Sequence, residues 1–347
     1  MFAEYDRGID MTTSSIPVVD IAPFREGGDG VGAAEAIGRA AVEVGFFQII
    51  GHGVPQRLLD DTYAAMHALT SLPVRDKEAL LANTRHPFRG VHLNRDKAGA
   101  IRHERFMAGR FEGAQEAVAN GVDAELADYF HDNWWPEVAG FREAVTACFA
   151  ETQKLAATMM QLFAMALGIG VAGFEGMIEP NSSTFAINHY PARNAPLDVD
   201  PTVVFDEHAD GNTLTLLHQH GDYAGLQVQR LDGGGEWMTV PRRDDAFVIN
   251  VGELMTLWTN DHWPSTRHRV VASSDPTASR TTLTTFHMPP LDAVIAPLAN
   301  FGGETDPHYA PITPREWDRQ FMRRRYAKPS ATTEHDPKVY EFVAGLE

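Results

Sequence analysis

The chain has little cysteine, a shortage of positive charge and no long hydrophobic run. Cys148 is its single cysteine, which excludes an intrachain disulfide and any zinc or iron–sulfur site built on several thiolates. The formal net charge of -18 argues against nucleic acid and anionic membranes as partners, because both bind basic surfaces. The apolar stretch at residues 159–169 is too short to span a membrane.

The remaining composition is that of a soluble globular protein. Its 347 residues can bury a large core, and 44% of them are hydrophobic and 22% charged. The first residues lack the apolar segment of a signal peptide, so we expect a cytoplasmic protein, as a monomer or a weak homo-oligomer. Residues 1–15 show no pattern and are expected to form a disordered tail.

Hydrophobic periodicity divides the rest of the chain into four parts. Residues 16–135 alternate short strands with helices. Residues 136–170 repeat apolar side chains every three or four positions, which predicts a scaffold helix lying against a sheet. Residues 180–290 switch to a period of two, in short runs between turn signals, which predicts an antiparallel sandwich or jelly roll. Residues 291–347 are expected to contain a helix that begins at a Thr-Pro-Arg-Glu capping box.

One stretch of the first part, residues 84–111, shows no clear period. We expect an irregular loop there, acting as a lid or a substrate loop. It carries a local excess of basic side chains: Arg85, His86, Arg89, His92, Arg95, Arg102, His103, Arg105 and Arg110. In an acidic chain such a cluster suggests an acidic or carboxylate-bearing small molecule as ligand. The alternative is a solvated loop balanced by Asp96, Glu104 and Glu112.

His208 and Asp210 are the most informative pair of residues in the chain. On a strand, residues i and i+2 point to the same face, so the His-Ala-Asp sequence places two metal-ligand side chains together. A histidine from a distant strand would complete a facial triad of two histidines and one carboxylate. That triad holds Fe(II) and leaves positions open for O2 and a chelating co-substrate.

The tripeptide alone is a weak signal, because the chain has 15 histidines and His220-Gly-Asp222 is a second match. Context favours the first match, which strand-forming residues flank, whereas the second lies in a turn-like stretch. His268 is the preferred third ligand because it opens a predicted strand shortly before Arg280. The competing histidines are His262, His287 and His220.

Arg280 opens a strand-forming run in which alternate residues, Thr282 among them, share its face. If it is buried, the arginine needs an anionic partner, and a ligand carboxylate would supply one through a bidentate contact. The alternative is a surface arginine beside solvated threonines. Asn188 and Tyr190 share a face of another run. Tyr190 is expected either to donate to the same carboxylate or to be a structural core residue.

Together these residues resemble a known family. The chain is similar, from residue 16 to about residue 326, to the non-haem Fe(II)/2-oxoglutarate-dependent oxygenases of the isopenicillin N synthase-like branch. The matching motifs are Gly45-Phe-Phe-Gln-Ile-Ile-Gly-His-Gly-Val54, Asn188-His-Tyr-Pro191, His208-Ala-Asp210, His268-Arg-Val270 and Arg280-Thr-Thr282. The chain departs from the family pattern in having Gly51 instead of Asn and Arg-x-Thr instead of Arg-x-Ser. The threonine keeps the hydroxyl group.

The resemblance implies a fold and a reaction. The fold would be mainly β with α, a double-stranded β-helix (jelly roll) core with a helical N-terminal portion, in a single domain at residues 16–347. Fe(II) would be held by His208, Asp210 and His268, with O2 as oxidant. 2-Oxoglutarate would be the co-substrate, bound by Arg280, Thr282, Tyr190 and Asn188. The reaction would hydroxylate, desaturate or cyclise a small molecule of secondary metabolism, with release of succinate and CO2.

Three alternatives to this function stay open at this point. One is an oxidase that uses no 2-oxoglutarate, as isopenicillin N synthase does. Another is a zinc hydrolase, because two histidines and an aspartate also suit zinc. The third is a non-catalytic jelly-roll binding module. Candidate contacts to a substrate come from the irregular stretch and from the last predicted strand: Phe88, Arg89, His103, Arg105, Phe286 and Met288.

Overall fold

The computed structural model describes residues 15–83, 86–96, 99–193 and 202–326, together with Val343 and Gly345. Except for Ser15, the expected tail lies outside the described residues, as do Thr84 and Arg85 of the basic stretch. In the part of the chain that is described, no helix is both long and apolar enough to cross a membrane.

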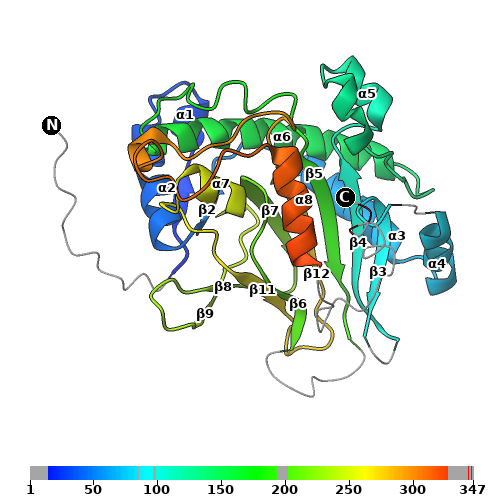
Figure 1. Ribbon diagram of the computed structural model, residues 1–347. Helices are drawn as coiled ribbons and strands as arrows, with labels where there is room; N and C mark the ends of the chain where they lie inside the picture. Colours follow the sequence, from blue (N-terminus) through cyan, green and yellow to red (C-terminus); the bar gives the residue numbers. More distant parts are fainter. Residues whose placement is uncertain are drawn as a thin grey trace.

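The strands form two sheets, as the jelly-roll prediction requires (Figure 1). The larger sheet has the order β1-β2-β10-β7-β12-β5-β4-β3, and the smaller has the order β6-β11-β8-β9. The bounds are β1 (Val18–Asp20), β2 (Phe46–Ile50), β3 (Gly90–Arg95), β4 (Ile101–Gly109), β5 (Thr184–Tyr190), β6 (Val203–His208), β7 (Leu214–Gly221), β8 (Leu226–Gln229), β9 (Trp237–Thr239), β10 (Phe247–Val251), β11 (His268–Val271) and β12 (Arg280–His287). Side chains of both sheets line one cavity, which therefore lies between them.

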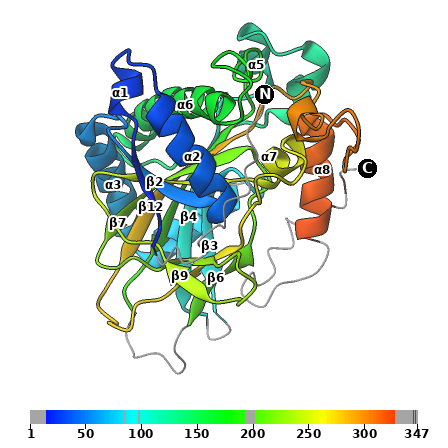
Figure 2. The ribbon, with the colours of Figure 1, turned by 90° about the vertical axis from the view of Figure 1, so that its left-hand side faces the viewer.

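Helices cover the sheets from outside. Their bounds are α1 (Ala22–Arg25), α2 (Val31–Glu43), α3 (Gln56–Thr70), α4 (Val74–Asn83), α5 (Ala114–Ala119), α6 (Phe141–Ala166), α7 (Glu253–Trp258) and α8 (Pro314–Arg325), with short 3-10 turns η1 (Ala124–Tyr129) and η2 (Ala299–Phe301). In Figure 2, α3 and α8 lie on opposite sides of the sheets. The predicted capping box begins α8, because the Thr313 hydroxyl accepts the Glu316 backbone N–H at 3.3 Å.

The predicted scaffold helix is α6, and it lies against the larger sheet. Its apolar stripe is buried, and Phe149 packs on Phe185 of β5 with 5.2 Å between ring centroids. Burial of each such side chain stabilises the fold by about 1.5–3 kcal/mol. The sheet is therefore anchored on its outer face, which leaves the inner face free to carry polar groups.

The expected loop at residues 84–111 is wrong for most of its length. β3 and β4 form an antiparallel hairpin, and β4 pairs with β5 so that Arg105 lies opposite Asn188. The alternation escaped detection because both faces of β4 mix apolar and charged side chains: Arg102 and Glu104 share the face of Phe106, and Arg105 points to the opposite face. Glu104 is nevertheless buried, and it pairs with Lys77 of α4 at 2.9 Å.

Candidate metal centre

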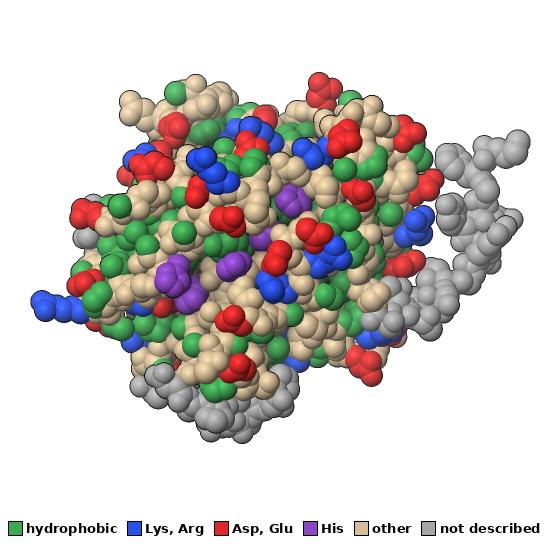
Figure 3. Space-filling model, turned by 180° about the vertical axis from the view of Figure 1, so that it is seen from behind, with side chains coloured by type: hydrophobic (Ala, Val, Ile, Leu, Met, Phe, Trp, Pro, Cys, Tyr) green, Lys and Arg blue, Asp and Glu red, His purple; other side chains and the backbone are tan. Residues whose placement is uncertain are grey.

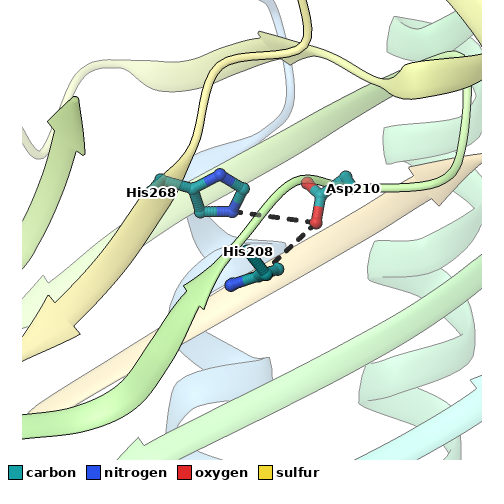
Figure 4. Close-up of side chains that lie close together, drawn as sticks. All are labelled: His208, Asp210 and His268. Atoms are coloured by element: carbon teal, nitrogen blue, oxygen red, sulfur yellow. Dashed lines mark ion pairs between the residues drawn. The ribbon is translucent and has the colours of Figure 1, made fainter. Parts of the chain in front are cut away.

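The side chains of His208, Asp210 and His268 point toward one another where the paired strands β6 and β11 meet (Figure 4). His208 is the last residue of β6 and lies opposite His268, the first residue of β11. Asp210 follows in the loop beyond β6. The prediction that His208 and Asp210 share one strand face is therefore wrong in detail, because the strand ends at His208. The turn after it still brings the carboxylate back to the histidines.

The three side chains present their ligand atoms at short range. The Asp210 Oδ1 atom lies 3.5 Å from His208 Nε2 and 3.7 Å from His268 Nε2. Figure 3 shows further histidines gathered on the face seen from behind. Among the described residues, however, only this group brings three potential ligand atoms within 4.8 Å of one another.

Backbone carbonyls fix the tautomer of both histidines. His208 Nδ1 lies 2.8 Å from the Asp206 carbonyl oxygen, and His268 Nδ1 lies 3.2 Å from that of Thr266. A carbonyl can only accept, so each Nδ1 carries the hydrogen and each Nε2 keeps its lone pair. Burial and the adjacent His208 lower the pKa of His268 to about 4, so this imidazole is neutral at pH 7.

The Asp210 carboxylate is held by two donors on its other oxygen. Its Oδ2 accepts hydrogen bonds from the Thr215 hydroxyl at 2.7 Å and from Asn250 Nδ2 at 2.9 Å. Oδ1 is thereby directed at the two imidazoles. Burial opposes ionisation of Asp210, but His268, His208 and Thr215 outweigh it and hold the pKa of the carboxyl well below its ordinary value.

These contacts make the site fit for a divalent cation. Two imidazole lone pairs and one carboxylate oxygen converge, and such electron-rich atoms repel one another unless a cation lies between them. Two histidines and one carboxylate are the ligand set of facial-triad Fe(II) sites, which leave coordination positions open. The arrangement can thus hold a metal ion and leave its remaining positions to other ligands.

Arg280 lies between the sheets and is 1% exposed, so the alternative of a surface arginine is wrong. Its Nη2 donates to Gln219 Oε1 at 3.1 Å, and the guanidinium carbon lies 5.4 Å from the centre of the Tyr190 ring. Its Nε is buried without a hydrogen-bond partner, and no described carboxylate forms an ion pair with it. A buried cation without an anionic partner costs several kcal/mol, so this one fits an anionic ligand.

His103 supports the residues beside Arg280. Its ring stacks on Tyr190 at 4.8 Å and 9°, and its Nε2 lies 3.0 Å from Asn188 Oδ1. Its Nδ1 lies 2.9 Å from Asn94 Nδ2, which can only donate, so the imidazole hydrogen is on Nε2. Asn188 Oδ1 is thus engaged, and the group that Asn188 offers to the cavity is its NH2.

Two cavities meet at the three converging side chains. A cavity of about 60 Å³ lies between the sheets and is lined by Arg280, Thr282, Tyr190 and Asn188. A larger cavity of about 600 Å³ opens beside it, under α8. The residues that line both cavities are Arg105, Phe205, His208, Asp210 and Phe286.

The residues nominated as substrate contacts fall into two groups. Those that line the larger cavity are Phe88, Arg89, Arg105, Phe286 and Met288. His103 lies outside the described lining of both cavities, because it is buried against Asn188 and Tyr190.

The sequence reasoning missed Gln219, Thr215 and Asn250, which hold Arg280 and Asp210. The role of Asn250 could have been suspected from the sequence, because it is the one polar residue in an otherwise apolar, buried strand.

The second His-x-Asp match has a different environment. β7 continues to Gly221, so His220 lies on a strand and the expectation of a loop residue is wrong. Its ring stacks on Tyr63 of α3 at 4.5 Å, on the outer face of the larger sheet. Asp222 accepts the backbone N–H of Ser279 at 2.8 Å. Neither residue lines the cavities described above.

Comparison with known proteins gives consistent matches. Residues 181–289 match the family model described as the 2OG-Fe(II) oxygenase superfamily. Residues 16–137 match the model described as the N-terminal part of non-haem dioxygenases in morphine synthesis. Gibberellin 20 oxidase 3 of Oryza sativa subsp. japonica is 31% identical, over 92% of this chain and 84% of its own length. Validamycin A dioxygenase of Streptomyces hygroscopicus subsp. limoneus is 31% identical, over 83% and 80%.

Solved structures agree with the fold. A 2OG-Fe(II) oxygenase family protein from Caulobacter crescentus superposes with a TM-score of 0.76 at 26% identity, over 91% of this chain and 100% of that chain. A full-length Neurospora crassa protein in complex with alpha-KG gives a TM-score of 0.76 at 22% identity, over 91% and 98%. The likeness to the isopenicillin N synthase-like branch is a coarse description beside these relatives.

The hydrogen bonds of His103 yield a stability prediction. His103→Phe keeps a ring against Tyr190 but leaves the Asn94 and Asn188 amides without their partner. Asn188 is buried, whereas Asn94 is partly exposed. An unsatisfied buried amide costs about 1–3 kcal/mol, so urea unfolding of the metal-free protein should show a lower free energy of unfolding. His67→Phe, an exposed position on α3, is the control. Equal stability of both variants would show that neither amide depends on His103.

Proposed function

The chain belongs to the 2OG-Fe(II) oxygenase superfamily, and from this membership we propose which of its residues serve the reaction. It is an Fe(II)- and 2-oxoglutarate-dependent dioxygenase that oxidises a small molecule. We propose that His208, Asp210 and His268 hold Fe(II). The convergence of two Nε2 atoms and one carboxylate oxygen supports this assignment.

The chain prepares the metal ligands before the metal binds. The carbonyls that accept from Nδ1 orient both rings with Nε2 toward the site, and Thr215 and Asn250 aim the carboxylate. Bound Fe(II) and 2-oxoglutarate supply the oxidising chemistry, in which O2 is reduced, 2-oxoglutarate becomes succinate and CO2, and the substrate is oxidised. Prior orientation of the ligands removes a reorganisation cost from metal binding.

The observation that carries the co-substrate proposal is the buried guanidinium of Arg280, which pairs with no carboxylate among the described residues. We place the carboxylate of 2-oxoglutarate remote from the metal on Arg280, with Thr282 and Tyr190 as further donors and the Asn188 amide toward the same cavity. Burial raises the pKa of Tyr190 to about 12, although Arg280 counteracts it, so the phenol stays protonated and able to donate.

The three alternative functions lose their basis. The family match at residues 181–289 is to 2OG-Fe(II) oxygenases, which supports the dioxygenase and none of the three alternatives. The relatives that the chain matches over most of their length are dioxygenases and oxidases of small molecules.

The finer proposal is that the small molecule carries a carboxylate. Arg89 and Arg105 line the larger cavity beside the metal ligands, and a cationic wall in a protein of net charge -18 selects for anions. The hairpin β3–β4 brings Arg105 there as part of the rigid sheet, so the lid role first expected for this stretch is replaced by a fixed wall.

Metal binding tests the ligand assignment. His208→Ala, Asp210→Ala and His268→Ala should each weaken anaerobic binding of Fe(II), measured by calorimetry. Loss of a residue that merely orients a ligand costs about 10–100-fold in metal affinity, so loss of a ligand should cost more. His220→Ala and Asp222→Ala are the matched controls from the second His-x-Asp match and should bind Fe(II) as the wild type does. The reverse pattern would refute the assignment.

Co-substrate saturation tests the role of Arg280. Loss of a buried charged contact costs about 2–5 kcal/mol, which corresponds to a rise of about 30-fold to several thousand-fold in the 2-oxoglutarate half-saturation of Arg280→Ala. The measurement is succinate release with Fe(II) and O2. Arg243→Ala, which removes an exposed arginine paired with Asp245, is the control. Substrate oxidation at full rate without 2-oxoglutarate would instead identify an oxidase.

A further inference from the structure

Arg105 stands at the junction of the two cavities. It lies on β4 opposite Asn188 of β5, and Asn188 in turn lies opposite Thr282 of β12. The three residues form one row across the inner face of the larger sheet. Arg105 therefore faces the metal ligands and lines both the small cavity and the large one.

The charge of Arg105 has no carboxylate partner within the described part of the chain. Its Nε is buried and makes no hydrogen bond. Burial is the main cause that lowers the pKa of the guanidinium. The groups that counteract it are the phenols of Tyr326 and Tyr190 and, more weakly, Asp210, while Arg325 of α8 adds a second positive charge. A desolvated cation in such surroundings is stabilised only when an anion joins it.

The other arginine nominated from this stretch is in a different position. Arg89 is also buried, but its Nη1 donates to the Phe88 carbonyl oxygen at 2.8 Å. Burial lowers the pKa of Arg89, and Tyr129 and Asp318 counteract that effect. Asp318 of α8 thus partly offsets its charge within the protein. Among the described residues, the only carboxylate that counteracts the burial of Arg105 is Asp210, which we assign to the metal, so of the two arginines Arg105 is the better candidate to bind an anionic ligand.

The rest of the larger cavity combines apolar walls with charged side chains, among them Arg315, Arg319 and Arg325 of α8. Its volume of about 600 Å³ falls in the range of roughly 300–1,000 Å³ that small-molecule sites occupy. The apolar side chains of the lining are Phe88, Met107, Phe205, Phe286, Met288, Phe321 and Met322. Aromatic and methionine walls of this kind suit the flat or puckered faces of a hydrocarbon ring system.

We propose that Arg105 binds the carboxylate of the primary substrate, a monoanion whose apolar, ring-bearing body fills the larger cavity. This inference rests on the proposed function, because it requires Arg280 to be occupied by 2-oxoglutarate. His208 and Asp210 line the junction beside Arg105. The carbon presented for oxidation is therefore one close to the carboxylate.

The test uses the full-length enzyme loaded with Fe(II) and 2-oxoglutarate. Naphthaleneacetic, cyclohexaneacetic and cinnamic acids are compared with their primary amides as stimulators of succinate release. The amides keep the shape and lose the charge. We expect acids to stimulate and amides not to. Arg105→Met should raise the half-saturation of a stimulating acid by at least about 30-fold and that of 2-oxoglutarate by less than about threefold.

Two further variants complete the test. Arg105→Lys keeps the charge and should retain part of the acid response, whereas Arg95→Met removes a hairpin arginine paired with Glu78 outside both cavities and should respond like the wild type. Ligand-free Arg105→Met should melt no lower than wild type, because its charge pairs with no carboxylate in the described part of the chain.

Several results would overturn the proposal. They are equal stimulation by acids and amides, no stimulation by any acid, an undiminished acid response in Arg105→Met, or a lower melting temperature of that variant. A larger rise in the 2-oxoglutarate half-saturation than in that of the acid would mean that Arg105 holds the co-substrate instead. Failure of the proposed function is distinguishable, because the wild type would then release no succinate with Fe(II) and 2-oxoglutarate.

Discussion

Two sets of side chains between the sheets, the three metal ligands and Arg280, carry charges or lone pairs that no neighbouring described residue neutralises. The donor atoms of His208, Asp210 and His268 repel one another without a cation, and the guanidinium of Arg280 is buried with no carboxylate beside it in the described structure. The charges of Fe(II), ionised Asp210, the 2-oxoglutarate dianion and Arg280 sum to zero. Metal and co-substrate together would therefore balance the charges of Asp210 and Arg280, and each makes the binding of the other more favourable, while the charge of Arg105 is left for the substrate. The fold tolerates the imbalance because the outer face of the larger sheet is anchored on α6.

The parts of the site that follow from local sequence were predictable. Alternation along a strand places Arg280 and Thr282 on one face, and both line the small cavity. His208, Asp210 and His268 were predictable from ligand type and strand context, because few side chains bind metals and strands meet in a jelly roll. The register that sets His208 opposite His268 is a tertiary property. The prediction reached the right residues, although Asp210 lies beyond the strand.

The parts that depend on pairing between distant segments were not predictable. The sequence of the hairpin β3–β4 was interpreted as a loop because polar side chains interrupt its alternation. Its strand structure depends on the pairing of β4 with β5, which is distant in sequence. His103 looked like a substrate contact from its place in the basic stretch, yet its neighbours Asn188 and Tyr190 come from β5 and make it a support. The sequence around Gln219 does not indicate its role, because Gln219 accepts a hydrogen bond from Arg280, which is distant in sequence.

An anaerobic crystal structure with Fe(II) and 2-oxoglutarate tests the central claim most directly. The account predicts one iron bound by His208 Nε2, His268 Nε2 and Asp210 Oδ1. It also predicts the remote carboxylate of 2-oxoglutarate within hydrogen-bond distance of the Arg280 guanidinium. Iron bound by other residues, or a co-substrate carboxylate that leaves Arg280 without an anionic partner, would contradict it.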